Sequence, residues 1–235
     1  MTTILLRHAS TSYSTHYLVN GDPGVRLPLD AEGVAACHVL RASGSLRHPR
    51  TWVTSAFPRA QQTTILLAGP AQLEPRIDAR LNELDYGDFE GGPFLDYADW
   101  LGRHGPYIRP PGAAESQHEA VIRMLAAVRD ALRHPGPRVV VAHGLLLSLL
   151  TWTMAEPSDE PLPLFFPEAR CLDPLVVTDT RLHGLTSRLI DRLTSEGVHA
   201  PPTGGGRAES PQAGVPILAN FDPLRTPPEE RSPHA

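Results

Sequence analysis

The chain has 235 residues, a formal net charge of −5 at pH 7 and 41% hydrophobic residues. This length suits a single globular domain with a substantial core. The excess of acidic residues argues against a general nucleic-acid binder and against a protein that binds anionic membranes. Any anion site must therefore be a local group of arginine and histidine side chains within an acidic protein.

The residue pattern alternates predicted strands with predicted helices. Apolar or β-branched runs predict the strands, and apolar residues at helical spacing predict the helices. In chain order, these elements are a strand at 2–6, a helix from Asp30 to about 46, a strand at 51–55, a helix at 58–67, a helix at 115–132, a strand at 138–142 and a helix at 145–154. This alternation is typical of βαβ units, so we expect an α/β fold: a three-layer α/β/α sandwich with a mostly parallel central sheet.

The end of the chain differs in composition from the rest. Residues 197–235 are rich in proline and glycine, which predicts a mostly disordered tail after a domain that covers residues 1–196. Within this tail the apolar segment 215–221 has a second interpretation, docking on the domain. The topology of residues 156–196 stays open.

Two cysteines and the apolar segments indicate the cellular compartment in which the protein is expected. Cys37 and Cys171 are far apart and lack metal-type spacing, which predicts reduced thiols in a cytoplasmic protein, with a single disulfide as the alternative. The first apolar run is broken at Arg7 and no basic segment precedes it, so we expect no signal peptide. The longest apolar segment, 139–155, contains His143 and predicts a buried strand and helix rather than a membrane span.

The first predicted strand ends at Arg7 and His8. Ligands of open α/β sheets bind at the carboxyl edge of the strands. An arginine can hold a phosphoryl group there, and a histidine can attack it. The same dipeptide occurs at 47–48, 103–104 and 133–134, but only the pair at 7–8 follows an apolar strand.

Two further predicted strands are also followed by side chains that can bind a phosphoryl group. Arg59 begins the helix after strand 51–55, and His143 follows strand 138–142. Helix N-termini favour anions through their free N–H groups. Two arginines and two histidines at one sheet edge therefore predict a phosphate pocket.

A carboxylate and several hydroxyls complete the candidate site. The glycine-containing loop 81–91 supplies four carboxylates, Glu83, Asp85, Asp88 and Glu90, as candidate acids for a departing oxygen. The hydroxyls of Ser10, Thr11 and Ser14 are candidate substrate contacts, with ordinary loop residues as the equal alternative.

Four segments, in order, resemble the motifs of the histidine phosphatase superfamily, also called phosphoglycerate mutase-like. They are Leu6-Arg7-His8-Ala9-Ser10-Thr11, the segment 54–63 that contains Arg59, the segment 81–91 that contains Glu83, and Val140-Val141-Ala142-His143-Gly144. The resemblance covers about residues 2–155 and implies the fold of that family.

The resemblance also implies roles for five residues. His8 would be the nucleophile that becomes phosphohistidine, and Arg7, Arg59 and His143 would hold the phosphoryl group. Glu83 would protonate the leaving oxygen and then activate water. No metal and no other cofactor is implied. Gly144, beside the second histidine, is a further candidate substrate contact.

Ala9 replaces the glycine that usually follows the nucleophile; alanine also occurs there in relay phosphatases, which generally lack the acid that Glu83 supplies here. Three other departures from the family pattern favour a phosphatase. Ser14 stands near the position of an asparagine of the mutases, and Leu145 replaces a polar contact. The stretch between the acid and the second histidine is also short for a mutase.

We therefore expect metal-independent hydrolysis of a small phosphorylated metabolite in the cytoplasm, with no nucleic-acid or membrane partner. The alternatives are a mutase that uses a bisphosphorylated cofactor and a non-catalytic phospholigand-binding protein. The natural substrate and the oligomeric state stay open.

Overall fold

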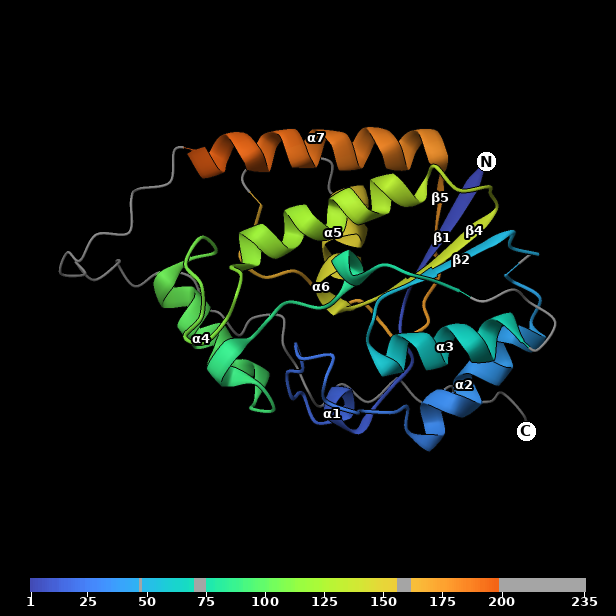
Figure 1. Cartoon of the computed structure of the whole chain (residues 1–235), viewed down its shortest axis with the longest axis horizontal. Coiled ribbons are helices and arrows are strands. Elements are labelled where there is room, and N and C mark those ends of the chain that lie inside the picture. Colours follow the sequence, from blue (N-terminus) through green and yellow to red (C-terminus); the bar gives the residue numbers. More distant parts are fainter. Residues whose placement is uncertain (47, 70–74, 156–161, 199–235) are drawn as a thin grey trace, which may run out of the picture. The chain divides into compact units, whose positions relative to one another are not determined.

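A five-stranded sheet lies at the centre of the fold, in the order β3-β2-β4-β1-β5 (Figure 1). The computed structural model describes residues 1–46, 48–69, 75–155 and 162–198. The strands are β1 (Thr2–Arg7), β2 (Thr51–Thr54), β3 (Arg76–Ile77), β4 (Arg138–Ala142) and β5 (Leu175–Thr178). Only β5, paired with β1, runs antiparallel in this sheet of the described residues, so the sheet is mostly parallel.

Helices cover both faces of the sheet (Figure 1). They are α1 (Ser12–Thr15), α2 (Ala31–Ala42), α3 (Pro58–Ala68), α4 (Phe94–His104), α5 (Gln117–Ala131), α6 (Gly144–Ala155) and α7 (Asp179–Val198), with two 3-10 turns, η1 (Ala79–Leu81) and η2 (Gly87–Phe89). The helices α2 and α3 pack on one face, and α5, α6 and α7 pack on the other. The predicted three-layer α/β/α sandwich is confirmed.

Strand β4 shows why the sheet is buried on both sides. Val139 and Val141 point into the core beneath α2 and α3, whereas Val140 and Ala142 point into the core beneath α5 and α6. Successive side chains of a strand alternate between faces, so a continuous apolar run suits a strand covered on both. The parallel register with β1, in which Arg7 pairs with Ala142, brings the carboxyl ends of both strands to one edge.

The structure adds elements that the sequence did not assign. These are α1, α4, the short strand β3, the two 3-10 turns and, in the open region 156–196, the strand β5 and the helix α7. The helix predicted to reach about residue 46 ends earlier, at Ala42, where Ser43 caps it and Gly44 turns the chain with a φ of 68°.

The predicted tail lies largely outside the described residues, and so does the segment 215–221. Only Gly197 and Val198 of it are described, as the last residues of α7. Within the described ranges, no helix has both the length and the hydropathy that a membrane crossing requires.

Candidate active site

The carboxyl ends of β1, β2 and β4 bring three side chains together. His8 follows β1, Ser55 follows β2 and His143 follows β4. The backbone N–H of His8 donates to the carbonyl of Ala142 at 3.0 Å, which extends the parallel pairing past the end of β1. The two imidazole rings lie with their centroids 5.2 Å apart, and both are buried.

The guanidinium of Arg59 joins the two histidines. Its Nε donates to Nε2 of His8 at 2.9 Å, and one terminal nitrogen lies 3.2 Å from Nδ1 of His143. Arg59 is the second residue of α3, and its Cζ lies 4.1 Å from the ring centroid of Phe57. A guanidinium has no acceptor atom, so both ring nitrogens must accept.

The tautomer of His8 follows from its second nitrogen. Nδ1 lies 2.7 Å from the carbonyl oxygen of Ala9, which can only accept, so Nδ1 carries the hydrogen. Nε2 therefore presents its lone pair. Burial, with the positive charges of Arg59 and Arg7, holds the pKa of His8 well below its usual value. The ring is therefore neutral at neutral pH, and the lone pair of Nε2 faces Arg59.

His143 has the opposite tautomer. Its Nε2 lies 2.7 Å from the hydroxyl oxygen of Ser55, and Nδ1 accepts from Arg59, so Nε2 carries the hydrogen. Burial, followed by the charge of Arg59, lowers the pKa of His143 well below its usual value. Sequence reasoning did not assign Ser55 this orienting role, although its place at the end of a buried strand was a signal.

Arg7 contacts a different part of the chain. One terminal nitrogen donates to Oε1 of Glu168 at 2.5 Å and to the carbonyl of Ala169 at 2.7 Å. Its Nε is buried and has no hydrogen-bond partner within the described residues. Buried N–H groups normally have a partner, and a phosphoryl oxygen is an acceptor of the kind that this one lacks.

Glu83 lies between η1 and η2 with 9% of its surface exposed. Its carboxylate accepts from the backbone N–H of Leu84 at 3.0 Å and from that of Leu145 at 3.5 Å. A Cβ placed on Gly144 would lie 3.6 Å from Oε2 of Glu83 and 3.7 Å from Cζ of Arg7. Gly144 therefore lies close to both the carboxylate of Glu83 and the guanidinium of Arg7.

Two competing carboxylates of the same loop, Asp85 and Glu90, accept hydrogen bonds from backbone N–H groups. Asp85 accepts from the N–H groups of Gly87 and Ala114. Glu90 accepts from the N–H of Gly21 at 2.6 Å. Glu83 also accepts from backbone N–H groups, so its position beside Gly144 and Arg7, rather than a lack of contacts, makes it the candidate acid.

The three hydroxyls near His8 make local contacts. Ser10 donates to Oδ1 of Asp30 at 2.7 Å. Thr11 caps α1, and Ser14 both accepts from its N–H and donates to its carbonyl. Capping accounts for these side chains, and a substrate contact from Ser10, Thr11, Ser14 or Gly144 stays a prediction.

Asn20 is a site residue that sequence reasoning missed. Its side-chain oxygen accepts from one terminal nitrogen of Arg59, and its carbonyl accepts from the other at 3.0 Å. Its amide nitrogen donates to Oε1 of Glu90 at 2.5 Å. The only sequence signal was a polar residue before Gly21 in an unassigned loop.

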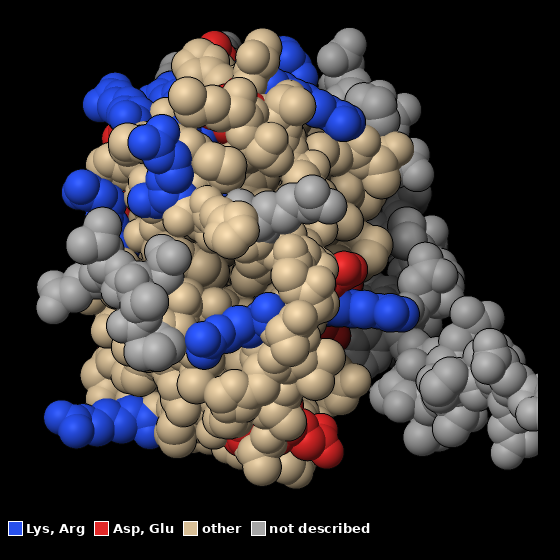
Figure 2. Space-filling view, turned by 90° about the vertical axis from the view of Figure 1, so that its right-hand side faces the viewer, with Lys and Arg blue, Asp and Glu red and all other residues tan. Residues whose placement is uncertain are grey.

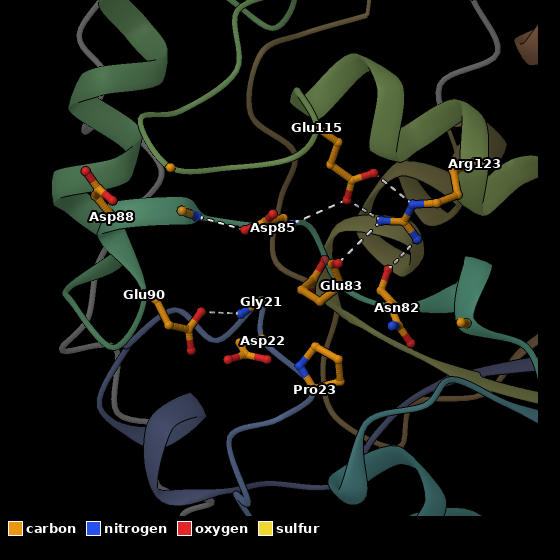
Figure 3. Close-up of a pocket in the computed structure, with 13 residues that line it drawn as sticks. Gly21, Asp22, Pro23, Asn82, Glu83, Asp85, Asp88, Glu90, Glu115 and Arg123 are labelled. Atoms are coloured by element: carbon orange, nitrogen blue, oxygen red, sulfur yellow. Dashed lines mark hydrogen bonds and ion pairs between the residues drawn. The ribbon is translucent and has the colours of Figure 1, made fainter.

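A cavity of 470 Å³ opens beside Glu83, and we call it the acid-side cavity (Figure 3). It is lined by Gly21, Asp22, Pro23, Ala79, Asn82, Glu83, Asp85, Gly87, Asp88, Glu90, Gly112, Glu115 and Arg123. Glu83 lines it and the two histidines do not, so it lies on the side of the candidate acid. Chemically, the site can thus hold an anion at the arginines and the rest of a molecule in this cavity.

Comparisons with known proteins agree with this geometry. The family model described as histidine phosphatase superfamily (branch 1) matches residues 3–179. A 2,3-bisphosphoglycerate-dependent phosphoglycerate mutase of Methylobacterium sp. (strain 4-46) is 33% identical over 178 residues, which cover 68% of this chain and 83% of the relative.

Solved structures of phosphatases are also similar. A mycobacterial glucosyl-3-phosphoglycerate phosphatase has a TM-score of 0.53 at 25% identity, over 65% of this chain and 81% of its own. A putative alpha-ribazole-5'-P phosphatase from Escherichia coli has a TM-score of 0.53 at 26% identity, over 65% of this chain and 78% of its own. Bacillus stearothermophilus YhfR shares the fold, with a TM-score of 0.61 at 24% identity over 75% of this chain and 90% of its own.

Proposed function

The chain belongs to the histidine phosphatase superfamily, and we propose that it hydrolyses a small phosphomonoester through a phosphohistidine at His8. One observation carries this proposal. Nδ1 of His8 is committed to the carbonyl of Ala9, which leaves the lone pair of Nε2 facing the guanidinium of Arg59. A phosphoryl group held by that guanidinium would lie in front of a neutral nucleophile.

The first half of the reaction forms the phosphoenzyme. The Nε2 lone pair of His8 attacks phosphorus while the bond from phosphorus to the leaving oxygen breaks. Glu83, in its acid form, gives its proton to that oxygen, so an alcohol departs. Arg7 and Arg59 donate N–H groups to the non-bridging oxygens, where negative charge accumulates.

The second half regenerates the enzyme. Glu83, now a carboxylate, takes a proton from a water molecule, and the water oxygen attacks phosphorus. The bond from phosphorus to Nε2 breaks, and its electron pair returns to His8. Inorganic phosphate leaves, and every residue is back in its starting state.

The same proposal includes a location and a partner: the protein acts in the cytoplasm, and its partner is a small phosphorylated substrate. Cys37 and Cys171 are free thiols, which supports a reducing compartment. Burial raises the pKa of Cys37 to about 11 and also raises that of Cys171. Both thiols are therefore protonated and weakly reactive.

A mutase is the second candidate, favoured by the names of the sequence relatives. It would transfer the phosphoryl group of His8 to a phosphoglycerate rather than to water. The acid-side cavity, with its many carboxylates, is a poor match for a phosphoglycerate, and this supports the hydrolase.

The deciding experiment measures hydrolysis of p-nitrophenyl phosphate by the purified protein in the presence of a chelator. We expect turnover, and we expect its loss in His8→Ala together with loss of an acid-labile, base-stable phosphoenzyme. Turnover that survives in His8→Ala would refute the nucleophile. Isomerisation of 3-phosphoglycerate that depends on added 2,3-bisphosphoglycerate would instead establish the mutase.

A further inference from the structure

A short segment between α6 and β5, residues 168–172, contacts the end of β1. The backbone N–H of Leu172 donates to the carbonyl of Arg7 at 3.1 Å. The carboxylate of Glu168 and the carbonyl of Ala169 accept from the guanidinium of Arg7. The segment therefore contacts both the backbone and the side chain of a residue that is proposed to hold the phosphoryl group.

The path of this segment is fixed at both ends. Near its start, the hydroxyl oxygen of Ser148 on α6 accepts from the backbone N–H of Ala169 at 2.9 Å. At its end, Leu172 packs against the core beneath α2 and α3 and has a φ of 59°. A positive φ is unusual for a bulky residue and persists only where the surroundings impose it. The carboxylate of Glu168 therefore reaches Arg7 from a supported backbone.

The contacts use one terminal nitrogen of the guanidinium. Nη1 of Arg7 donates to Oε1 of Glu168 at 2.5 Å and to the carbonyl of Ala169 at 2.7 Å. Among the described residues, Nε and Nη2 have no acceptor, although Nε is buried. In a planar guanidinium, Nε–H and one N–H of Nη2 point in the same direction and can donate to two oxygens of one phosphate. We call this pair of N–H groups the free edge of Arg7.

The free edge borders the same space as the candidate acid. A Cβ placed on Gly144 would lie 3.7 Å from Nε of Arg7 and 3.6 Å from Oε2 of Glu83. Because position 144 is a glycine, this space is not filled by a side chain of its own. A phosphoryl group held by the free edge would thus lie near the group that protonates the leaving oxygen.

We propose that Glu168 is a positioning residue: by holding Nη1, it keeps the free edge of Arg7 aimed at the phosphoryl group. The proposal rests on the proposed function, in which Arg7 holds that group. Arginines on the face in Figure 2 lie at the surface, with uncharged residues between them, whereas only 12% of the side chain of Arg7 is exposed. An exposed ion pair orients its partners weakly, but here the arginine is buried and Ala169 is a second acceptor on the same nitrogen.

Two substitutions of Glu168 separate the acceptor from the charge. Glu168→Ala removes both, whereas Glu168→Gln keeps an oxygen that accepts from Nη1. We expect Glu168→Ala to lower kcat for p-nitrophenyl phosphate by about fivefold or more, because a small displacement of a binding group lowers rates steeply. Glu168→Gln should stay within about twofold of the unsubstituted protein. Glu32→Ala removes an exposed carboxylate from the first turn of α2 and, as the matched control, should leave kcat unchanged.

Binding of inorganic phosphate separates positioning from repulsion. A carboxylate beside a phosphate site also repels phosphate, and if repulsion were the main effect of Glu168, both variants would bind phosphate more tightly. Positioning predicts that Glu168→Ala binds phosphate about threefold more weakly and that Glu168→Gln binds it at least as tightly as the unsubstituted protein. Isothermal titration calorimetry measures these dissociation constants.

The free edge also has a spectroscopic signature. In ¹H–¹⁵N spectra, the Nε–H signal of Arg7 is the one that is absent from Arg7→Lys. It should shift when phosphate is added, because this N–H then gains an acceptor. The shift should persist in Glu168→Gln and be smaller in Glu168→Ala. An unshifted signal at saturating phosphate would refute the free edge as the binding edge.

The proposal fails if Glu168→Ala keeps the kcat of the unsubstituted protein, if Glu168→Gln loses as much as Glu168→Ala, or if Glu168→Ala binds phosphate more tightly. Turnover of p-nitrophenyl phosphate by the unsubstituted protein reports on the proposed function separately. If that turnover is absent, the order of the phosphate affinities still tests the positioning of Arg7, because binding of phosphate requires no chemistry.

Discussion

At the scale of single residues, Arg59 determines the protonation of the site. It can only donate, so its contacts with His8 and His143 make one nitrogen of each ring an acceptor. Ala9 and Ser55 hold the hydrogens on the other nitrogens. One guanidinium thus fixes opposite tautomers in two imidazoles that burial, with its charge, holds neutral.

The tautomers can be measured directly. In the free protein at neutral pH, long-range ¹H–¹⁵N correlation spectra should show His8 protonated at Nδ1 and His143 protonated at Nε2. Replacing Arg59 with Met removes the donor and the charge, so the pKa of His8 should rise. It should stay below the usual value, because burial is the larger cause. An imidazolium at His8 at neutral pH would contradict this assignment.

Asn20 is expected to position Arg59. Asn20→Ala removes the side-chain acceptor and should lower kcat/KM for p-nitrophenyl phosphate by about tenfold, since charge-assisted hydrogen bonds are worth roughly 1.5–3 kcal/mol. Gln61→Ala is the matched control, because Gln61 lies on the same helix and donates to the carbonyl of Ala56. A loss as large in the control would show a general effect on α3.

At the scale of elements, the N-terminus of α2 supports the loop that follows β1. Asp30 caps α2 by accepting from Gly33 at 2.7 Å, and its Oδ1 also accepts from the hydroxyl of Ser10. A Cβ on Gly33 would lie 2.5 Å from the carbonyl oxygen of Ser10. The helix and the loop beside His8 therefore fit only with glycine at this position.

Two glycine substitutions test this fit. Gly33→Ala should push the loop away from α2, lower the free energy of unfolding by about 1–3 kcal/mol and reduce activity. Gly102→Ala, inside α4 with open space around it, should raise the free energy of unfolding by about 0.5–1 kcal/mol, because alanine is the better helix former. Denaturant titrations and kcat/KM measure both effects. Equal stability of the two variants would contradict the close packing at Gly33.

The sequence predicted those elements that repeat a simple pattern. The apolar run of β4 and the N-cap Asp30 are local signals, and the parallel strands they imply bring Arg7, His8 and His143 to one edge. Contacts between loops leave no repeating pattern of residues in the sequence. The bond from Arg59 to Asn20 and the bond from Arg7 to Glu168 depend on loop paths, and the acid-side cavity depends on several of these paths at once. The antiparallel edge strand β5 was not assigned, although its residues form a β-branched run as short as that of β2.

At the scale of the whole molecule, burial of the site affects stability. Both imidazoles are held neutral because burial disfavours their charged form. The unfolded chain has no such restriction, and its histidines take up protons near pH 6.5, roughly the usual value. Below that pH the unfolded state therefore binds more protons than the folded state.

The free energy of unfolding should consequently fall as the pH drops from about 6.5 towards 5. Each of His8 and His143 adds a slope of about 1.4 kcal/mol per pH unit once its unfolded form is protonated. Replacing both with Gln should lower the slope of the free energy of unfolding against pH by about 2–3 kcal/mol per pH unit in this window. His38→Gln, at an exposed position, is the control and should leave this slope unchanged. Burial also lowers the pKa values of His118 and His134. Both residues are present in every variant, so their contribution to the slope cancels when variants are compared. Urea titrations at several pH values measure the slopes, and an unchanged slope in the double variant would show that the two imidazoles are charged in the folded protein.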